Sequence, residues 1–491
     1  MATFTPATPA PAPMNLADRA ARVRFRRAVT LMAFTLVAPG SAQLITGNRR
    51  VGRVALRIWF TTIVLGVTAL VVAYEFPGFA VRQVVVLHLL TIARLGLIAG
   101  AIGWVYLLVD AWRIGQPLSL VRQQRLMMTG VNGVMCFSVA AVLLYGSHMA
   151  GTTNDFLSMF GTGAATGAHD GRYNVLLLGG DSGASRVGMR TDSMTVASID
   201  ADTGKTVLIG LPRNLENFTF APGSVMAKQF PHGFDCGIPN CELNAVSTWA
   251  EDHPKLFGKT DVGDKTAGME ATLSAIEGVT GLKINYWAMV DLQGFRDLSK
   301  AIGGVTIDVR QPIAVGKTGD IKGYIPAGKQ KLEGNDLLWY ARSRATSDDY
   351  SRMARQKCVM NAMLSQISPM DVVRHFDALE KATTGTISTD LPGSEVGRFV
   401  DLALKARSQK MATVSLVPPV VNTADPSMPK VHALIANAIA KSEGRSVPGG
   451  GAKKKHHHHA VSTAGQMGEG SLGSYQSGYT ANQTSNLGAS C

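Results

Sequence analysis

The first third of the chain is dominated by long apolar runs. Three of them hold few charges and are long enough to cross a membrane as helices: residues 58–74, 84–112 and 127–149. A fourth run, residues 28–46, is broken by Pro39-Gly40-Ser41, which predicts a re-entrant or interfacial hairpin. We therefore expect residues 28–149 to form an α-helical membrane module.

Farther along, the pattern changes to short β-type runs that alternate with helical stretches. Strands are predicted at 174–178, 193–199, 206–211, 286–290, 304–309 and 413–417. Helices are predicted at 267–279, 293–301, 350–366, 371–383 and 432–441. This alternation is typical of the α/β class, and we expect an α/β/α sandwich with a mixed central sheet over residues 171–445.

The remaining segments are poor in core-forming residues. Residues 1–27 combine an Ala/Pro/Thr-rich start with a basic block and predict a disordered cytoplasmic tail. Residues 150–170 are rich in Gly, Thr and Ala, as expected of a linker. Residues 446–491 are of low complexity and contain a Lys/His run, so we expect a disordered tail.

Positive charge is concentrated beside the apolar runs. Residues 1–126 contain 14 Arg, no Lys and three acids, and so contribute +11 of the net charge of +13. Basic residues flanking membrane spans mark the cytoplasmic side, so this excess indicates topology, and we expect no nucleic-acid partner. Three crossings from an inner N-terminus predict a multi-pass protein of the cell membrane, in contact with the lipid bilayer, whose large domain is extracytoplasmic. A further crossing by 28–46 would reverse that orientation.

Two of the five cysteines, Cys236 and Cys241, flank a turn-like Gly-Ile-Pro-Asn spacer. They are candidates for a small disulfide loop, which requires an oxidising compartment and agrees with an extracytoplasmic domain. A zinc pair is the alternative, although the sequence offers no evident second pair of ligands.

The most informative stretch is 334–356, GNDLLWYARSRATSDDYSRMARQ, which contains four arginines among acids and tyrosines. The apolar run before Arg342 and Arg344 places both near buried structure. Arg352 and Gln356 are four residues apart and share one face of a helix that begins near Tyr350. Guanidiniums that converge from two elements suit an anion with several oxygens. A solvated helix face is the alternative interpretation.

Further polar residues lie where the predicted strands begin or end. Asp181 ends one strand and Asp192 begins the next, so their carboxylates meet if these strands are neighbours. A divalent cation such as Mg²⁺ takes one or two carboxylates together with phosphate oxygens. The arginines of this set would neutralise the remaining phosphate charge: Arg186, Arg190, Arg213, Arg342, Arg344, Arg352 and Arg355. A purely structural arginine–aspartate network is the alternative.

Five linked motifs, in consistent order over about residues 171–420, resemble the LytR–CpsA–Psr family, its actinobacterial members in particular. They are Asn174-Val-Leu-Leu-Leu-Gly-Gly-Asp181, Arg190-Thr-Asp192-Ser-Met, Leu211-Pro-Arg213-Asn214, Gly303-Gly-Val-Thr-Ile-Asp-Val309, and Tyr340-Ala-Arg-Ser-Arg344 with Asp349-Tyr-Ser-Arg352-Met-Ala-Arg355-Gln356. The stretch from Phe230 to Cys236 and from Cys241 to Ala245 also resembles these members.

The resemblance implies a membrane-anchored phosphotransferase that moves a glycopolymer, with its linking phosphate, from a polyprenyl-pyrophosphate carrier onto a peptidoglycan acceptor. It implies Mg²⁺ at Asp181 and Asp192, and Asp349 as the base for the acceptor hydroxyl. It also implies pyrophosphate contacts from these residues: Arg190, Arg213, Arg342, Arg344, Arg352 and Gln356. Arg342 and Arg344 are counted with Asp349 in the catalytic set, and Arg355 with the pyrophosphate ligands.

The sequence departs from the family pattern at two positions. Gly183 stands where many members have Arg, so Arg186 is expected to take that role, and Asn214 stands where many have Asp, so Asn214 receives no catalytic role. Two other functions share these residues. A polyprenyl-phosphate-binding regulator requires neither Asp349 nor metal, and a pyrophosphatase requires no acceptor groove. The glycopolymer itself is not encoded in these motifs.

Overall fold

The computed structural model describes the backbone of residues 16–46, 48–158, 160, 165–181, 190–237, 241–258, 266–367, 386–407, 409–445 and 482–490. The predicted helix 371–383 and Arg186 lie outside these residues, as do the side chains of Asp181 and Arg190. The chain divides into two compact units, Met1–Asn154 and Asp155–Cys491.

The first unit is helical. Its elements are α1 (Leu16–Val37), α2 (Ser41–Thr46), α3 (Arg49–Glu75), α4 (Pro77–Val86), α5 (Leu89–Ile114), η1 (Pro117–Ser119) and α6 (Arg122–Ser158). Among the described residues, three segments are long and apolar enough to cross a membrane: Arg49–Glu75, Leu89–Ser119 and Arg122–Asp155. They correspond to the three predicted spans.

The predicted boundaries of this unit need two corrections. The disordered tail was predicted to reach residue 27, but α1 begins at Leu16, because its arginines alternate with good helix formers whose apolar face packs through Leu31 and Met32. The linker was predicted from residue 150, but α6 continues to Ser158. The break at Pro39-Gly40 is present between α1 and α2, with Gly40 at φ +98°.

The second unit is an α/β/α sandwich, as predicted. Its sheet is mixed and has the strand order β10-β3-β2-β1-β4-β9 in the described chain, with β10 parallel to β3, β4 parallel to β1, and the other pairs antiparallel. The strands are β1 (Arg172–Asp181), β2 (Arg190–Asp200), β3 (Thr206–Leu211), β4 (Tyr286–Asp291), β9 (Ile387–Thr389) and β10 (Ala412–Ser415).

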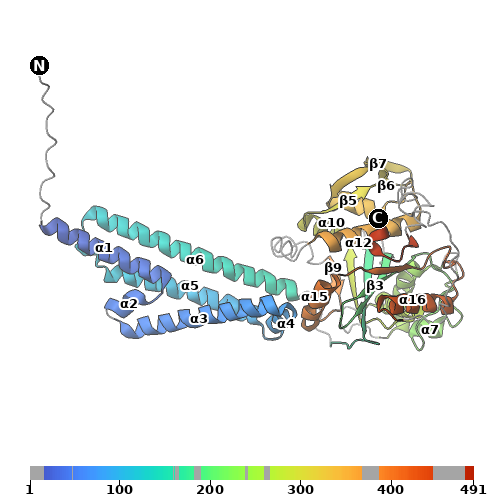
Figure 1. Ribbon diagram of the computed structural model, residues 1–491, viewed down its shortest axis with the longest axis horizontal. Coiled ribbons are helices and arrows are strands. Elements are labelled where there is room, and N and C mark those ends of the chain that lie inside the picture. Colours follow the sequence, from blue (N-terminus) through green and yellow to red (C-terminus); the bar gives the residue numbers. More distant parts are fainter. Residues whose placement is uncertain are drawn as a thin grey trace, which may run out of the picture. The chain divides into compact units, whose positions relative to one another are not determined.

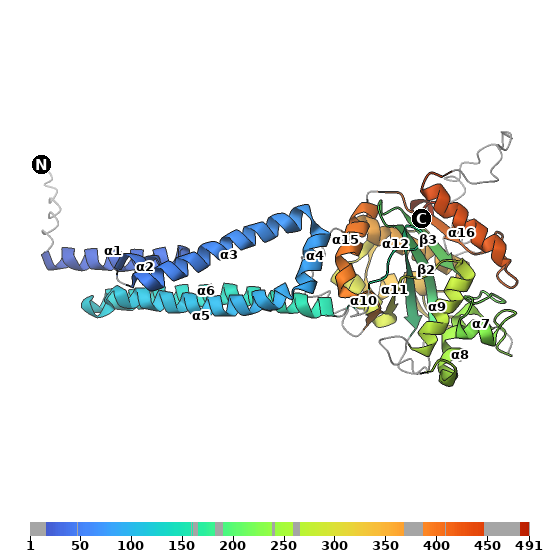
Figure 2. The same cartoon turned by 90° about the horizontal axis from the view of Figure 1, so that it is seen from below.

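Helices cover both faces of this sheet (Figures 1 and 2). The helices of the unit are α7 (Val225–Gln229), η2 (Leu243–Ala245), α8 (Val246–Asp252), η3 (Pro254–Leu256), α9 (Ala267–Thr280), α10 (Leu292–Ala301), α11 (Gly334–Arg342), α12 (Asp349–Gln366), α15 (Gly393–Arg407), α16 (Met428–Ser442) and η4 (Leu487–Ser490). Alternation along β3 sends Val207 and Ile209 into the core with α9 and α16, whereas Leu208 faces the α12 side.

Two further antiparallel strand pairs lie beside α10 and α12 (Figure 1), and of their four strands only the one at 304–309 was predicted from the sequence. They are β5 (Val305–Val309) with β8 (Gly328–Leu332), and β6 (Ile313–Lys317) with β7 (Asp320–Ile325). The glycine pair before β5 has a steric reason: Gly304 has φ +74°, and a Cβ there would lie 2.6 Å from the carbonyl oxygen of Leu332.

The predicted disordered C-terminal tail also needs correction. Residues 482–490 are ordered against the domain: Asn482 and Leu487 are each 2% exposed. Asn486 bridges Ala412 of β10, and Leu487 packs with Leu208 of the sheet. The low-complexity composition therefore gave no indication that a short segment packs against the domain through two buried residues, Asn482 and Leu487.

Candidate active site

The site is assembled at the end of the sheet where β1, β2 and β3 place their polar residues. Asp192 lies in a β-bulge of β2, because Gly179 pairs with Ser193 and Gly180 pairs with Thr191, which leaves Asp192 without a partner in the ladder. A bulge re-aims the side chain at that position. Arg213 follows β3 after Pro212, and its guanidinium reaches Asp192 with Nη1–Oδ1 3.1 Å.

The start of α12 supplies the carboxylate at the centre. Asp348 is the N-cap, and its side chain accepts a hydrogen bond from the Ser351 amide at 2.8 Å. Asp349 is therefore held in the first turn, where the helix dipole favours a negative charge.

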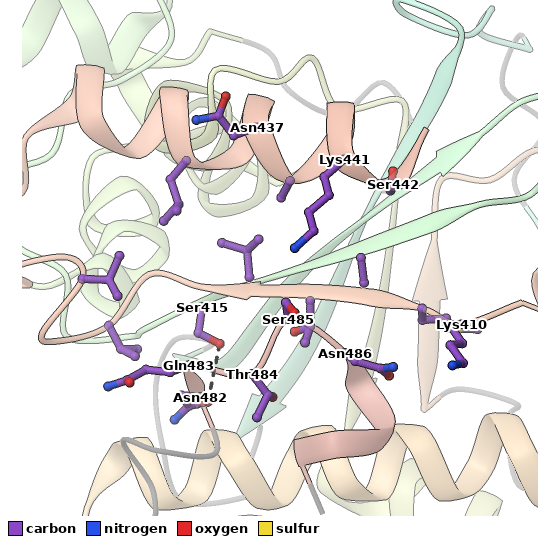
Figure 3. Close-up of a pocket in the computed structure, with 18 residues that line it drawn as sticks. Lys410, Ser415, Asn437, Lys441, Ser442, Asn482, Gln483, Thr484, Ser485 and Asn486 are labelled. Carbon is purple, nitrogen blue, oxygen red and sulfur yellow. Dashed lines mark hydrogen bonds between the residues drawn. The ribbon is translucent and has the colours of Figure 1, made fainter. Parts of the chain in front are cut away.

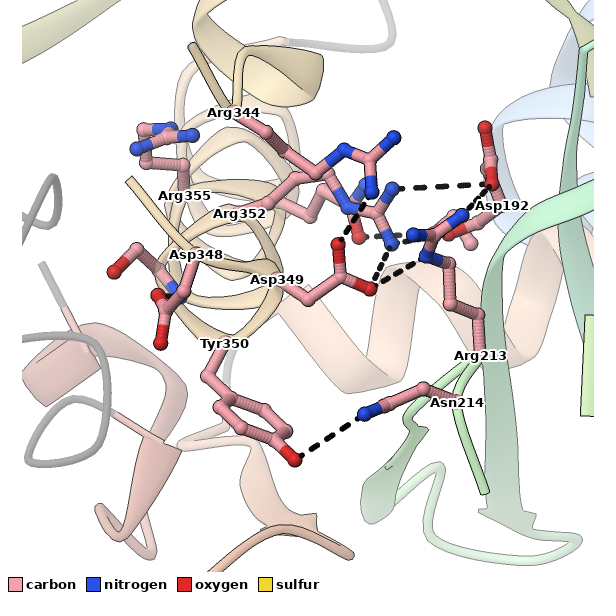
Figure 4. A network of polar contacts seen from close by, with 12 residues as sticks. Asp192, Arg213, Asn214, Arg344, Asp348, Asp349, Tyr350, Arg352 and Arg355 are labelled. Atoms are coloured by element: carbon pink, nitrogen blue, oxygen red, sulfur yellow. Dashed lines mark hydrogen bonds and ion pairs between the residues drawn. The ribbon is translucent and has the colours of Figure 1, made fainter. Parts of the chain in front are cut away.

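Three guanidiniums surround Asp349 (Figure 4). Arg213 Nε donates to Oδ2 at 2.6 Å, Arg344 Nη1 to Oδ1 at 3.1 Å, and Arg352 Nη2 to Oδ2 at 3.3 Å. They come from the end of β3, from the loop between α11 and α12, and from α12 itself. Three residues of one stretch and one residue from far earlier in the chain thus form one ion-pair cluster, which we call the Asp349 cluster: Arg213, Arg344, Asp349 and Arg352.

Two opposing effects set the pKa of Asp349: its burial and the positive charges of the neighbouring arginines. Burial alone raises the pKa of Asp349, but the charges of Arg352, Arg213 and Arg344 outweigh it and hold that pKa below its usual value. Asp349 is consequently ionised at neutral pH. Arg352 is almost fully buried, and its Nη2 also donates to the backbone carbonyl of Asp192 at 2.8 Å.

Gln356 lies one turn after Arg352 on the same helix, as its spacing predicted. Its side-chain oxygen accepts a hydrogen bond from Ser193 at 3.1 Å, which ties α12 to β2 beside Asp192. Gln356 and Asp192 both line a narrow cavity of about 40 Å³ between α12 and the sheet. Its lining also includes the apolar residues Leu208 and Met360, so the cavity adjoins both the polar site and the apolar layer.

The structure places Arg355 apart from this cluster. Its side chain points away from Asp349 and is 1% exposed (Figure 4). The Nε atom donates to the carbonyl of Tyr340 at 2.7 Å, and Nη2 donates to the carbonyl of Ser343. Arg355 thus fastens the end of α11 to α12, which is a different role from the predicted pyrophosphate contact.

Arg342 ends α11, and its guanidinium carbon lies 5.2 Å from the centroid of the Trp339 ring. Arg344 is two residues farther on, and its side chain is 44% exposed and so accessible to a ligand. The backbone of Arg190 pairs with that of Asp181, so β1 and β2 are neighbours at this end, which is the condition for the Asp181 and Asp192 carboxylates to meet.

The residues present fit a divalent cation in one respect. Asp181 ends β1 beside the bulge that carries Asp192, and two carboxylates at adjoining strand ends are a donor set that Mg²⁺ accepts. Among the described side chains, no group of three or more His, Cys, Asp or Glu gathers as a metal site. Any cation here would therefore depend on these two carboxylates and on substrate oxygens.

Comparison with known proteins gives the family of the chain. Residues 147–428 match the model of the LytR_cpsA_psr family. The chain belongs to the LytR–CpsA–Psr family.

Two of its relatives have names that refer to cell wall biosynthesis or to transfer of teichoic acid to peptidoglycan. The cell wall biosynthesis protein LcpA of Corynebacterium glutamicum is 27% identical over 252 residues, 47% of each chain. The Bacillus subtilis polyisoprenyl-teichoic acid–peptidoglycan teichoic acid transferase TagV is 25% identical over 191 residues, 36% of this chain and 48% of that one. The chain thus aligns with about half the length of these relatives. The crystal structure of B. subtilis TagV is 20% identical, with a TM-score of 0.40, and covers 57% of this chain and 99% of its own.

The LytR–CpsA–Psr motifs account for the Asp349 cluster but not for all of its neighbours. The Cys236–Cys241 disulfide is present, with a Cα–Cα distance of 5.6 Å. Directly after it, the backbone amides of Leu243 and Asn244 donate to the carbonyls of Leu215 and Arg213. The disulfide loop therefore packs against the segment that carries Arg213.

Glu242 was missed in the sequence. Burial raises the pKa of this carboxyl, and it interacts electrostatically with Arg213 and with Asp349. In the sequence, only the position of Glu242 directly after the predicted disulfide indicated that it could lie near the site. Asn214 and Tyr350 were also given no role, and their side chains form a hydrogen bond of 3.4 Å at the edge of the cluster.

Proposed function

We propose that this chain is a phosphotransferase that attaches a glycopolymer from a polyprenyl-pyrophosphate carrier to peptidoglycan through a phosphodiester bond. The observation that carries the proposal is the Asp349 cluster, in which three converging guanidiniums surround one ionised carboxylate. Phosphoryl transfer requires positioning and neutralisation of charge more than covalent chemistry by the protein.

Three guanidiniums share two carboxylates at this site. Arg213, Arg344 and Arg352 pair with Asp349, and Arg213 also pairs with Asp192, so a pyrophosphate with several anionic oxygens competes well for the same donors. When it binds, the arginines neutralise the developing charge on the leaving polyprenyl phosphate, and Asp349 is released from part of its pairing.

Asp349 then accepts the proton of the acceptor hydroxyl. The hydroxyl oxygen forms a bond to the phosphorus that carries the glycan, and the bond from that phosphorus to the polyprenyl phosphate breaks. The products are the phosphodiester-linked glycan and polyprenyl phosphate. Magnesium, held by Asp181 and Asp192, would add positive charge at the same pyrophosphate.

We further propose that this domain is extracytoplasmic. The Arg-rich N-terminal flanks, three candidate spans and a disulfide in the second unit support that orientation. Lys255 is exposed, so Lys255→Cys should react with a membrane-impermeant maleimide in intact cells. Labelling that requires permeabilised cells would place the domain in the cytoplasm instead.

The function is tested with the full chain in nanodiscs, a polyprenyl-pyrophosphate glycan and a peptidoglycan oligosaccharide. Mass spectrometry should find a phosphodiester-linked product that depends on magnesium and is lost in Arg342→Ala. Arg407→Ala is the matched control, because Arg407 is an exposed arginine of α15. Release of glycan phosphate alone would indicate a hydrolase, and binding of the lipid without turnover would indicate a regulator.

A further inference from the structure

The segment Asn482–Ser490, which we call the C-terminal segment, is held by a polar anchor that is unusually well buried. The Asn482 side-chain nitrogen donates to the Tyr350 carbonyl at 2.7 Å, and Ser415 Oγ donates to its side-chain oxygen at 3.4 Å. The buried ammonium of Lys357 lies 3.5 Å from the Asn482 carbonyl oxygen. One asparagine thus links the segment to α12 and β10.

An edge-strand pairing and an apolar contact complete the attachment. The Thr413 amide donates to the Ser485 carbonyl at 3.1 Å, and the Leu487 amide donates to the Met411 carbonyl at 3.1 Å. Leu487 inserts between the sheet and α12, where it packs in one cluster with Leu208 and Met360.

The same two apolar residues, Leu208 and Met360, also line the narrow cavity that begins at Asp192 and Gln356. Leu487 of the C-terminal segment therefore packs against two of the apolar residues that wall this cavity. Lys357 lines this cavity as well.

On its other side the segment borders a second, larger cavity of about 500 Å³ (Figure 3). This cavity is walled by β10, by the face of α16 that carries Leu434 and Ala438, and by residues 482–486. Thr413 lines both cavities. The segment thus lines the large cavity through residues 482–486 and, through Leu487, packs against two residues that wall the small one.

We propose that the C-terminal segment is an internal plug that keeps an apolar chain out of the space beneath α12 until the segment is displaced. This inference rests on the proposed function, because it assigns the apolar chain to the substrate whose pyrophosphate binds at the arginines. Leu487 occupies the space, and Asn482 holds it there.

The experiment measures binding to the full chain in nanodiscs, with two probes. Geranylgeranyl pyrophosphate reports the head group and the apolar path, and inorganic pyrophosphate reports the head group alone. In the double variant Asn482→Ala, Leu487→Ala, we expect about tenfold tighter binding of the lipid and unchanged binding of pyrophosphate. Gln483→Ala is the matched control, because Gln483 belongs to the same segment and its side chain is exposed. The samples are kept oxidised, since Cys358 of α12 is disulfide-bonded.

A measurement on the unaltered protein guards against a variant that folds poorly. Hydrogen exchange at the amides of Thr413 and Leu487 should become faster with geranylgeranyl pyrophosphate and stay the same with pyrophosphate, because both amides donate within the plug. Equal or weaker lipid binding in the double variant, or unchanged exchange with lipid bound, would overturn the plug. Failure of both probes to bind any variant would instead count against the proposed function.

Discussion

Arg213 and Asp349 are 136 residues apart in the chain, yet Arg213 Nε donates to Asp349 Oδ2 at 2.6 Å. The contact joins the end of β3 to the first turn of α12, and Arg213 also reaches Asp192 on β2. Without a substrate, these arginines are paired with the protein's own carboxylates. The arginine–aspartate network that the sequence left as an alternative is therefore present, and a pyrophosphate would compete with it for the same guanidiniums.

Asp349→Asn separates the roles of charge and base. The variant should lose transfer by about 100-fold or more, because the proton acceptor is gone. It should bind inorganic pyrophosphate at least as tightly as the unaltered chain, because three guanidiniums lose a competing carboxylate. Titration calorimetry and a turnover assay on the same preparation measure both quantities. Loss of pyrophosphate binding in this variant would show that Asp349 positions the arginines instead of competing with the ligand.

Arg213→Ala should lower the rate of transfer more than the partial exposure of the Arg213 side chain suggests. The substitution removes one donor from Asp349 and one from Asp192, so both carboxylates lose a fixed partner. We expect the rate of transfer to fall by about 100-fold or more, as when one charge-stabilising donor is removed from an active site. Arg407→Ala serves as the control. If Arg213→Ala turned over within a few-fold of the unaltered chain, Arg213 would not be the residue that stabilises the leaving polyprenyl phosphate.

Much of this arrangement follows from the sequence, because strand ends and helical spacing are local properties. Asp192 of β2 and Arg213 after β3 form an ion pair, and Arg352 and Gln356 share a face of α12. The bulge at Asp192 was not predictable, since it depends on the pairing of β1 with β2. Arg352 and Arg355 also look equivalent in sequence, and only the packing of α11 separates them.

The packing of the C-terminal segment against the domain was also not predictable from the sequence. Asn482 and Leu487 lie in a tail whose composition predicts disorder, and nothing nearby in the sequence indicates burial. Three of their partners, Tyr350, Lys357 and Leu208, are more than 100 residues away, and Ser415 is 67 residues from Asn482. Composition reports the average tendency of a segment, whereas one or two anchors decide whether part of it docks.

The burial of Lys357 predicts how the stability of the folded state depends on pH. Burial lowers its pKa to about 7, whereas an unfolded lysine has a pKa of about 10.4. Between these values the unfolded chain binds a proton that the folded chain does not, so the stability of the folded state rises with pH across this window. Below it, the cost of burying the charge is fully present.

Lys357→Met should therefore raise the melting temperature of the second unit most at about pH 6 and less at about pH 9. Differential scanning fluorimetry of the full chain at both pH values measures the effect, and Lys255→Met, at an exposed lysine, is the control. A melting temperature that is lower at both pH values would mean that the contact of Lys357 with Asn482 outweighs the cost of burial.

Arg355 and Arg344 provide a paired test of structure against ligand binding. Arg355→Met leaves the carbonyls of Tyr340 and Ser343 without this donor inside the protein, which should cost roughly 2–4 kcal/mol of stability. Arg344→Met removes a guanidinium that is 44% exposed, so the melting temperature should change little while transfer and pyrophosphate affinity fall. Arg355→Lys should recover only part of the stability, because an ammonium lacks the planar fork that reaches both carbonyls. The decisive readout is pyrophosphate binding by the folded fraction of Arg355→Met. Retained pyrophosphate affinity would support the role of Arg355 in fastening α11 to α12. Lost affinity in a fully folded variant would mean that Arg355 binds the pyrophosphate.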